Sequence, residues 1–284
     1  MKITYSGNTD KGRVRKANED YFANERISDK EYLFIVADGM GGHQAGDVAS
    51  KLGTLTFINE YKSLRAKNNS IGDSMQQSIK EANATILAKA SADLAKKGMG
   101  TTFSALIIAD MKAHIVHVGD SRIYRIRDNE IRKITTDHTF VEKMMEEGRL
   151  SEEEARNHPQ KNILYMSLGA RESFAPIVID DLEVKNGDIF IMCSDGLNNM
   201  VPDDVIREYS LSQGSPKELV DELIKLANEK GGTDNITIQA VQLGKNQNFK
   251  KTEPINIVKK KGVIIALSLI GTLVIFLILF LVFK

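Results

Sequence analysis

Short apolar runs separated by polar or glycine-rich turns recur along the chain up to about residue 243. Six of these runs predict β-strands, at 32–37, 102–109, 113–118, 123–126, 188–193 and 236–243. The runs at 113–118 and 123–126 are separated only by a short link that contains Gly119. We therefore expect these two strands to form a hairpin.

Apolar residues at helical spacing predict two long amphipathic helices between the strands at 32–37 and 102–109. One stripe consists of Val48, Leu52 and Leu55, and the other of Ile71, Met75, Ile79, Ala82 and Ile86. We expect both stripes to pack against the core. A helical hairpin is predicted at about 139–158, where Ser151 and Glu154 form a capping-box pattern.

The order of these elements indicates the fold class. The helices lie between groups of strands instead of following each strand in turn. This order favours an α+β sandwich of antiparallel sheets over a doubly wound parallel sheet.

The last part of the chain has a different pattern. Residues 263–283 contain no charge, and a helix of that length spans about 32 Å, enough to cross a bilayer. The run is preceded by Lys259, Lys260 and Lys261, and a basic segment beside a membrane span is expected on the cytoplasmic side. Residues 1–20 have no signal-peptide pattern. We expect a cytoplasmic domain at 1–243, a basic linker at 244–262 and a single-pass anchor in the cell membrane at 263–283.

Composition excludes several classes of protein. Lysine and arginine number 38, as do aspartate and glutamate, so the net charge gives no case for nucleic-acid binding. Cys193 is the only cysteine, which excludes an internal disulfide and fits a reducing compartment. It lies in an apolar run and is expected in the core. Asn199 stands where a Cys-x5-Arg phosphatase motif needs its arginine, so Cys193 is not expected to act as a nucleophile.

Five short motifs that contain aspartate lie near the ends of predicted strands. They are Asn18-Glu19-Asp20, Asp38-Gly39-Met40-Gly41-Gly42, Gly119-Asp120-Ser121, Ser194-Asp195-Gly196 and Gly232-Thr233-Asp234-Asn235. Each alone could be a turn. Carboxylates that converge repel one another unless cations lie among them, and oxygen ligands suit Mg²⁺ or Mn²⁺. Arg15 is a candidate for binding phosphate oxygens. The first hypothesis is a metal-dependent reaction on an anionic substrate.

In this order, the motifs resemble those of the PPM family, the metal-dependent type 2C serine/threonine protein phosphatases, and specifically its bacterial branch. The matching segments are 15–20, 38–43, 98–102, 119–122, 194–197 and 231–235, and the resemblance runs from about residue 3 to 243. It implies two packed antiparallel sheets flanked by helix pairs. It also implies hydrolysis of phosphoserine and phosphothreonine by a hydroxide that bridges two cations.

The same resemblance assigns roles to single residues. Asp38 would bridge two Mn²⁺ or Mg²⁺ ions, with the Gly39 carbonyl on one of them and Asp195 and Asp234 on the other. Asp120 would join Asp195 in holding a possible third ion. In the layer around the ions, the resemblance implies supporting roles for Glu19, Asp20 and Asn235, and it places Arg15 on the substrate phosphate.

Two parts of this chain depart from the family pattern or vary within it. Animal members carry a histidine two residues after the bridging aspartate, but this chain has Met40 there, as bacterial members usually do, which leaves the general acid open. The segment at about 139–172 corresponds to the variable flap. Met166 stands where many bacterial relatives have a basic residue, and His138 is a candidate for handling the substrate.

Three interpretations compete at this stage. The first is a membrane-anchored phosphatase that acts on phosphorylated proteins, with a Ser/Thr kinase and its substrates as partners. The others are a catalytically inactive binding module and a phosphohydrolase for small molecules. The intact Asp38, Asp195 and Asp234 favour an active enzyme.

Overall fold

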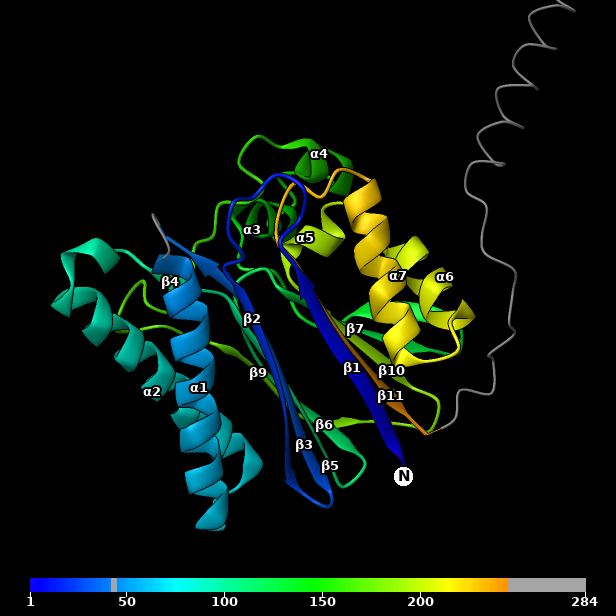
Figure 1. Cartoon of the computed structure of the whole chain (residues 1–284), viewed down its shortest axis with the longest axis horizontal. Coiled ribbons are helices and arrows are strands. Elements are labelled where there is room, and N and C mark those ends of the chain that lie inside the picture. The colour runs from blue at the N-terminus through cyan, green and yellow to red at the C-terminus, as the bar shows by residue number, and fades with distance from the viewer. Residues whose placement is uncertain (42–44, 245–284) are drawn as a thin grey trace, which may run out of the picture. The chain divides into compact units, whose positions relative to one another are not determined.

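The computed structural model describes residues 1–41 and 45–244, which form two stacked antiparallel sheets with helices on both outer faces (Figure 1). In spatial order, the first sheet consists of β1 (Ile3–Asp10), β11 (Ile236–Leu243), β10 (Ile189–Cys193), β7 (Arg122–Arg127) and β8 (Glu130–Lys133). The second consists of β2 (Asp20–Ser28), β3 (Glu31–Met40), β5 (Phe103–Ala109), β6 (Lys112–Val118) and β9 (Ile177–Glu183), with β4 (Gly100–Thr101) beside β3. The predicted α+β sandwich is confirmed.

The central strands are apolar on both faces because both faces are covered. On β3, Phe34 and Val36 face the other sheet and pack with Phe190 of β10. Leu33 and Ile35 belong instead to the core beneath the helices on the outer face. A strand that is buried on both faces has an unbroken run of apolar residues, and such a run in the sequence predicts this kind of strand.

Each sheet carries a pair of helices on its outer face (Figure 1). The second sheet is covered by α1 (Ala45–Ala66) and α2 (Ile71–Ala92), which is followed by the short 3₁₀ helix η1 (Leu94–Lys96). The first sheet is covered by α6 (Asp203–Ser212) and α7 (Pro216–Glu229), and the short α5 (Asp195–Asn198) follows β10.

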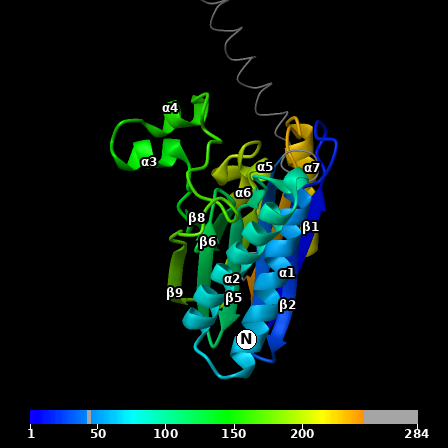
Figure 2. The ribbon, with the colours of Figure 1, turned by 90° about the vertical axis from the view of Figure 1, so that its left-hand side faces the viewer.

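Two further helices form the flap. Helices α3 (Phe140–Glu146) and α4 (Glu152–Asn157) project from one end of the sheets (Figure 2). The predicted capping box is present at the start of α4: Glu154 N donates to the Ser151 hydroxyl, and Ser151 N donates to the Glu154 carboxylate.

The predicted hairpin between residues 113–118 and 123–126 is wrong. Strand β6 pairs with β5 and β9 in one sheet, whereas β7 pairs with β10 and β8 in the other. The link between them therefore carries the chain across the sandwich. Gly119 permits this crossing because its φ is +106°, and a Cβ there would lie 2.6 Å from the Thr102 side chain.

The first predicted helical stripe is only partly correct. Val48 and Leu52 pack against the core, but Leu55 is 42% exposed. The fully buried positions of α1 include Ala49 and Phe57. The stripe of α2 is confirmed: four of its five members are fully buried, and Ile71 is partly buried.

No helix within residues 1–41 and 45–244 is both long and apolar enough to cross a membrane. The predicted anchor at 263–283 lies outside the described residues, as does the predicted linker except for Gly244.

Candidate active site

Strands and turns that are far apart in the chain bring Asp20, Asp38, Asp120, Asp195 and Asp234 close enough for their charges to interact, and we call this site the cleft. Asp20 and Asp38 are direct partners across the β2–β3 ladder. The Ser194 hydroxyl donates a hydrogen bond of 2.7 Å to Asp20 Oδ2, which joins this hairpin to the turn before Asp195. Asp195 is the first residue of α5.

Close contact between two turns places Asp195 near Asp234. A Cβ on Gly196 would lie 1.9 Å from the carbonyl oxygen of Asn235, so only glycine lets α5 approach the turn before β11. The Asn199 amide donates to Asp195 Oδ2 at 2.9 Å and holds that carboxylate in place.

Asn235 organises the loop that carries Arg15. Its Oδ1 accepts from Glu19 N at 2.9 Å, and its Nδ2 donates to the carbonyls of Lys11 and Ala17, also at 2.9 Å. One buried amide thus fixes both ends of the loop at 11–19.

Arg15 lies at the rim of the cleft with half of its side chain exposed. Its Nη2 donates to Asp234 Oδ2 at 2.7 Å, and Asp234 Oδ1 accepts from Asn235 N at 2.8 Å. The guanidinium is therefore oriented by the cleft while still open to an anionic ligand.

The end of β3 packs closely on the start of α1. A Cβ on Gly39 would lie 2.1 Å from the carbonyl oxygen of Gly46, and Gly39 N donates to Glu19 O at 3.1 Å. The backbone of Gly39 is thus held beside Asp38 by two neighbouring segments. Gly42 and His43 lie outside the described residues.

Burial and mutual repulsion raise the pKa values of these carboxyl groups. Burial raises the pKa of Asp20 to about 7 and that of Asp195 to about 6. The pKa values of Asp38 and Asp120 lie well above the ordinary value, because of burial first and the neighbouring carboxylates second. For Asp38 these neighbours are Asp20, Asp195, Asp120 and Asp234. Nearby cations would reverse these shifts.

The donor set fits hard divalent cations. Asp20 Oδ1 and Asp195 Oδ1 are buried without a hydrogen-bond partner, so each offers a lone pair that the protein does not use. The aspartates present only oxygen donors, which Mg²⁺ and Mn²⁺ prefer.

A second group with metal-ligand chemistry lies away from the cleft. Among the described residues, only His114, Asp180 and Asp181 place three such donor atoms within 4.8 Å of one another, and the cleft aspartates are spaced more widely. His114 Nδ1 contacts Asp180 Oδ1, and Lys112 Nζ lies 2.8 Å from Asp181 Oδ1. Asp181 is thus paired with Lys112, and Asp180 contacts His114, so these side chains already have partners within the protein.

His138, the candidate for handling the substrate, is buried, with 3% of its area exposed. Gly119 N donates to His138 Nδ1 at 3.0 Å, and His138 N donates to Gly119 O at 2.7 Å. Its ring packs against Tyr165 of the flap. This side chain therefore holds the turn that carries Asp120 and presents little surface to a substrate.

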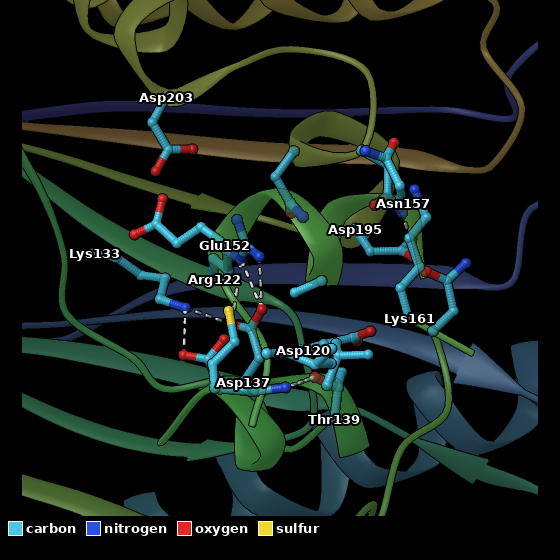
Figure 3. Close-up of a pocket in the computed structure, with 18 of the residues that line it drawn as sticks. Asp120, Arg122, Lys133, Asp137, Thr139, Glu152, Asn157, Lys161, Asp195 and Asp203 are labelled. Carbon is cyan, nitrogen blue, oxygen red and sulfur yellow. Dashed lines mark hydrogen bonds and ion pairs between the residues drawn. The ribbon is translucent and has the colours of Figure 1, made fainter. Parts of the chain in front are cut away.

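A cavity of about 930 Å³ adjoins the cleft and extends beneath the flap (Figure 3). Asp120 and Asp195 line it on the side of the cleft, and residues of α3 and α4 line it on the flap. Arg122 and the buried Asp137 also line the cavity, where Arg122 Nε and Nη2 donate to Asp137 Oδ2 at 2.9 and 2.7 Å. The sequence does not predict this pair, although Arg122 belongs to the motif at 119–122.

Known proteins with similar sequences and structures identify the family. The model of the family described as protein phosphatase 2C matches residues 11–236. The serine/threonine phosphatase stp of Listeria innocua is 39% identical over 238 residues, which cover 82% of this chain and 93% of that protein.

Two solved structures agree with that match. The crystal structure of the Mycobacterium tuberculosis serine/threonine phosphatase PstP/Ppp has a TM-score of 0.77 at 34% identity and covers 86% of this chain and 99% of that one. The catalytic domain of PstP in complex with two manganese ions has a TM-score of 0.73 at 33% identity, with the same coverage. The chain therefore belongs to the protein phosphatase 2C family of metal-dependent serine/threonine protein phosphatases.

Proposed function

We propose that the cleft of Asp38, Asp195 and Asp234 hydrolyses phosphoserine and phosphothreonine in proteins. The observation that carries this proposal is the gathering of acidic groups from separate strand ends, with pKa values raised by burial and repulsion, beside an oriented arginine. Clustered carboxylates favour bound cations, and the cations together with Arg15 would attract a phosphate.

The residues that would hold the cations follow from the donor set. Asp38, the Gly39 carbonyl, Asp195 and Asp234 would hold two Mn²⁺ or Mg²⁺ ions, and Asp120 with Asp195 would hold a third. The two manganese ions in the PstP catalytic domain support this assignment. When bound, such ions make water a strong nucleophile near neutral pH and offset the charge of the phosphate.

The chain's own residues orient the substrate around that centre. Arg15 binds the phosphate oxygens, and its ion pair with Asp234 fixes the guanidinium before the substrate arrives. Asn235 keeps the Arg15 loop in place, and Glu19 and Asp20 accept hydrogen bonds from water in the cleft. Met40 carries no titratable proton, so we infer that the leaving alkoxide takes its proton from water.

The cellular setting is also part of the proposal. The uncharged run at 263–283 and the lysines before it support a cytoplasmic catalytic domain at 1–243, tethered to the cell membrane through the linker at 244–262. The expected partners are a Ser/Thr kinase and the proteins it phosphorylates. A tether would raise the local concentration of the enzyme near membrane-bound substrates.

A phosphopeptide assay with Mn²⁺ tests the catalytic proposal. Asp38→Ala and Asp195→Ala should each lower the rate by about a thousandfold, whereas the exposed Asp204→Ala should leave it unchanged. Binding of the phosphopeptide without hydrolysis by the wild type would favour an inactive binding module. Small phosphoesters hydrolysed much faster than phosphopeptides would favour a small-molecule phosphohydrolase.

A further inference from the structure

The cavity beneath the flap carries more negative than positive charge. Seven carboxylates and three cations line it. Two of the cations are already paired: Arg122 lies 2.7 Å from Asp137, and Lys133 lies 2.9 Å from Glu142. Lys161 is the third cation that lines the cavity. Even when Asp120 and Asp195 are assigned to the proposed metal centre, five carboxylates face three cations, so the lining keeps a surplus of negative charge.

Two of the remaining acids have no positive partner among the side chains that the structure describes. Among the residues whose side chains are described, no lysine, arginine or histidine forms an ion pair with Glu146 or Asp203. Asp203 Oδ1 accepts a hydrogen bond of 3.1 Å from the neutral Tyr124 hydroxyl. Glu146 belongs to the flap, and Asp203 is the first residue of α6 (Figure 3). These two carboxylates therefore line the cavity from the flap and from α6.

The same cavity has an apolar side. Val141, Met145, Leu150 and Ala155 of the flap line it together with Met200. A wall of this kind suits the methylene stem of a long basic side chain, whose charged end then reaches the carboxylates. The apolar groups would not contribute to binding a metal ion, and the carboxylates would repel a phosphate.

We propose that this cavity receives an arginine or lysine side chain of the phosphoprotein substrate, close in sequence to the phosphorylated residue. The inference rests on the proposed phosphatase activity, because Asp120 and Asp195, which are assigned to the metal centre, also line the cavity. The phosphate lies on the Arg15 side of the cleft, and the basic side chain lies on the flap side. Arginine fits best because its guanidinium can engage two carboxylates at once.

The test uses the full chain with Mn²⁺ and pairs of phosphothreonine peptides. In each pair, arginine or its neutral isostere citrulline occupies one position, and the position is moved step by step along both sides of the phosphothreonine. At one or two positions, arginine should raise kcat/KM by about tenfold over citrulline. This ratio should fall as salt is added, because screening weakens the attraction.

Isosteric variants locate the effect. Asp203→Asn with Glu146→Gln should reduce the arginine-to-citrulline ratio to near one while leaving hydrolysis of the citrulline peptide unchanged. The matched controls are Asp204→Asn and Glu147→Gln, because each removes the same charge from the next residue, and neither residue lines the cavity. Both controls should keep the full ratio.

The outcomes separate the two proposals. A ratio of one at every position in the wild type, with all peptides hydrolysed, overturns the cavity assignment and leaves the phosphatase proposal intact. A ratio that survives in the double variant, or is lost equally in the controls, also overturns the assignment. Failure to hydrolyse any phosphopeptide would contradict the proposed function itself.

Discussion

Like charges lie opposite one another at the centre of the cleft. Asp20 and Asp38 are cross-strand partners, an arrangement that destabilises a sheet when both groups are ionised. Burial raises the pKa of both side chains further. The residues of the cleft are therefore unfavourable for folding on their own and favourable for binding cations, a balance common at functional sites.

Arg15 offers a test of phosphate binding at the level of one side chain. Arg15→Ala should lower kcat/KM for phosphopeptides by about 10- to 100-fold, mainly through KM, because a half-exposed guanidinium is lost from the cleft. The kcat/KM of Arg15→Lys should lie between those of the wild type and Arg15→Ala, since lysine keeps the charge but lacks the planar guanidinium that makes two hydrogen bonds. Lys16→Ala, an exposed neighbour, should have no effect; an equal loss there would contradict the assignment.

His117 predicts how stability responds to acid. Burial lowers its pKa to about 3, and Nε2 donates to Thr136 O at 3.2 Å. In the unfolded chain, its pKa is about 6.5. Between these values the unfolded state binds a proton that the folded state does not, so stability present above about pH 6.5 is lost as the pH falls.

The expected size of this effect can be measured against a neutral variant. From about pH 7 to about pH 5.5, the free energy of unfolding of the wild type should fall by about 1 kcal/mol more than that of His117→Gln. Denaturant unfolding of both proteins at the two pH values gives this difference. An identical change in both proteins would contradict this account, because it would mean that the pKa of His117 is the same in the folded and the unfolded chain.

At the scale of elements, the flap is attached to the body at both ends by buried side chains. At its start, His138 exchanges two hydrogen bonds with Gly119. At its end, Asn83 of α2 accepts from Gly169 N at 2.8 Å and donates to Arg171 O at 3.0 Å. The cavity beneath the flap therefore has one wall whose position depends on a few polar contacts.

Asn83→Ala tests this attachment. The substitution leaves the buried amide of Gly169 without a partner, which should lower the free energy of unfolding by about 1–3 kcal/mol. Hydrogen exchange at residues 160–172 should become faster, while exchange in β5 and β6 should not change. Glu81→Ala, on an exposed turn of the same helix, should alter neither; unchanged exchange in the Asn83 variant would refute the attachment.

At the scale of the whole molecule, the sequence predicted the six inner strands and missed the four strands at the sheet edges. β1, β2, β8 and β9 each have a neighbour on one side only. Their solvent-exposed positions break the apolar runs, so periodicity could not find them. Helices α6 and α7 were also missed, although Ser215 and Pro216 form a recognisable helix start.

Strand pairing and side-chain packing explain the other differences between the predicted and the observed structure. Each aspartate could be placed from its own strand end, but the direction of the chain after Gly119 depends on which sheet has a free position for β7. The cavity depends on side chains from the flap, α5 and α6 together, so no local pattern could predict it. The bonds of Asn235 to Lys11, Ala17 and Glu19 likewise join residues more than 200 positions apart.

Removal of residues 245–284 tests the division of the chain into a catalytic domain and a tether. The shortened protein should keep its kcat/KM for phosphopeptides, because every residue assigned to the cleft lies before 245. It should also leave the membrane fraction, in which the full chain is expected. A shortened chain that folds but lacks activity would contradict the proposed organisation.

The most direct test of the central claim is to count the Mn²⁺ ions bound by metal-free protein in a calorimetric titration. The wild type should bind at least two ions, and both Asp38→Asn and Asp195→Asn should lose at least one of them while remaining folded. A wild type that binds no Mn²⁺, or variants that bind as many ions as the wild type, would show that these aspartates do not form the catalytic metal centre.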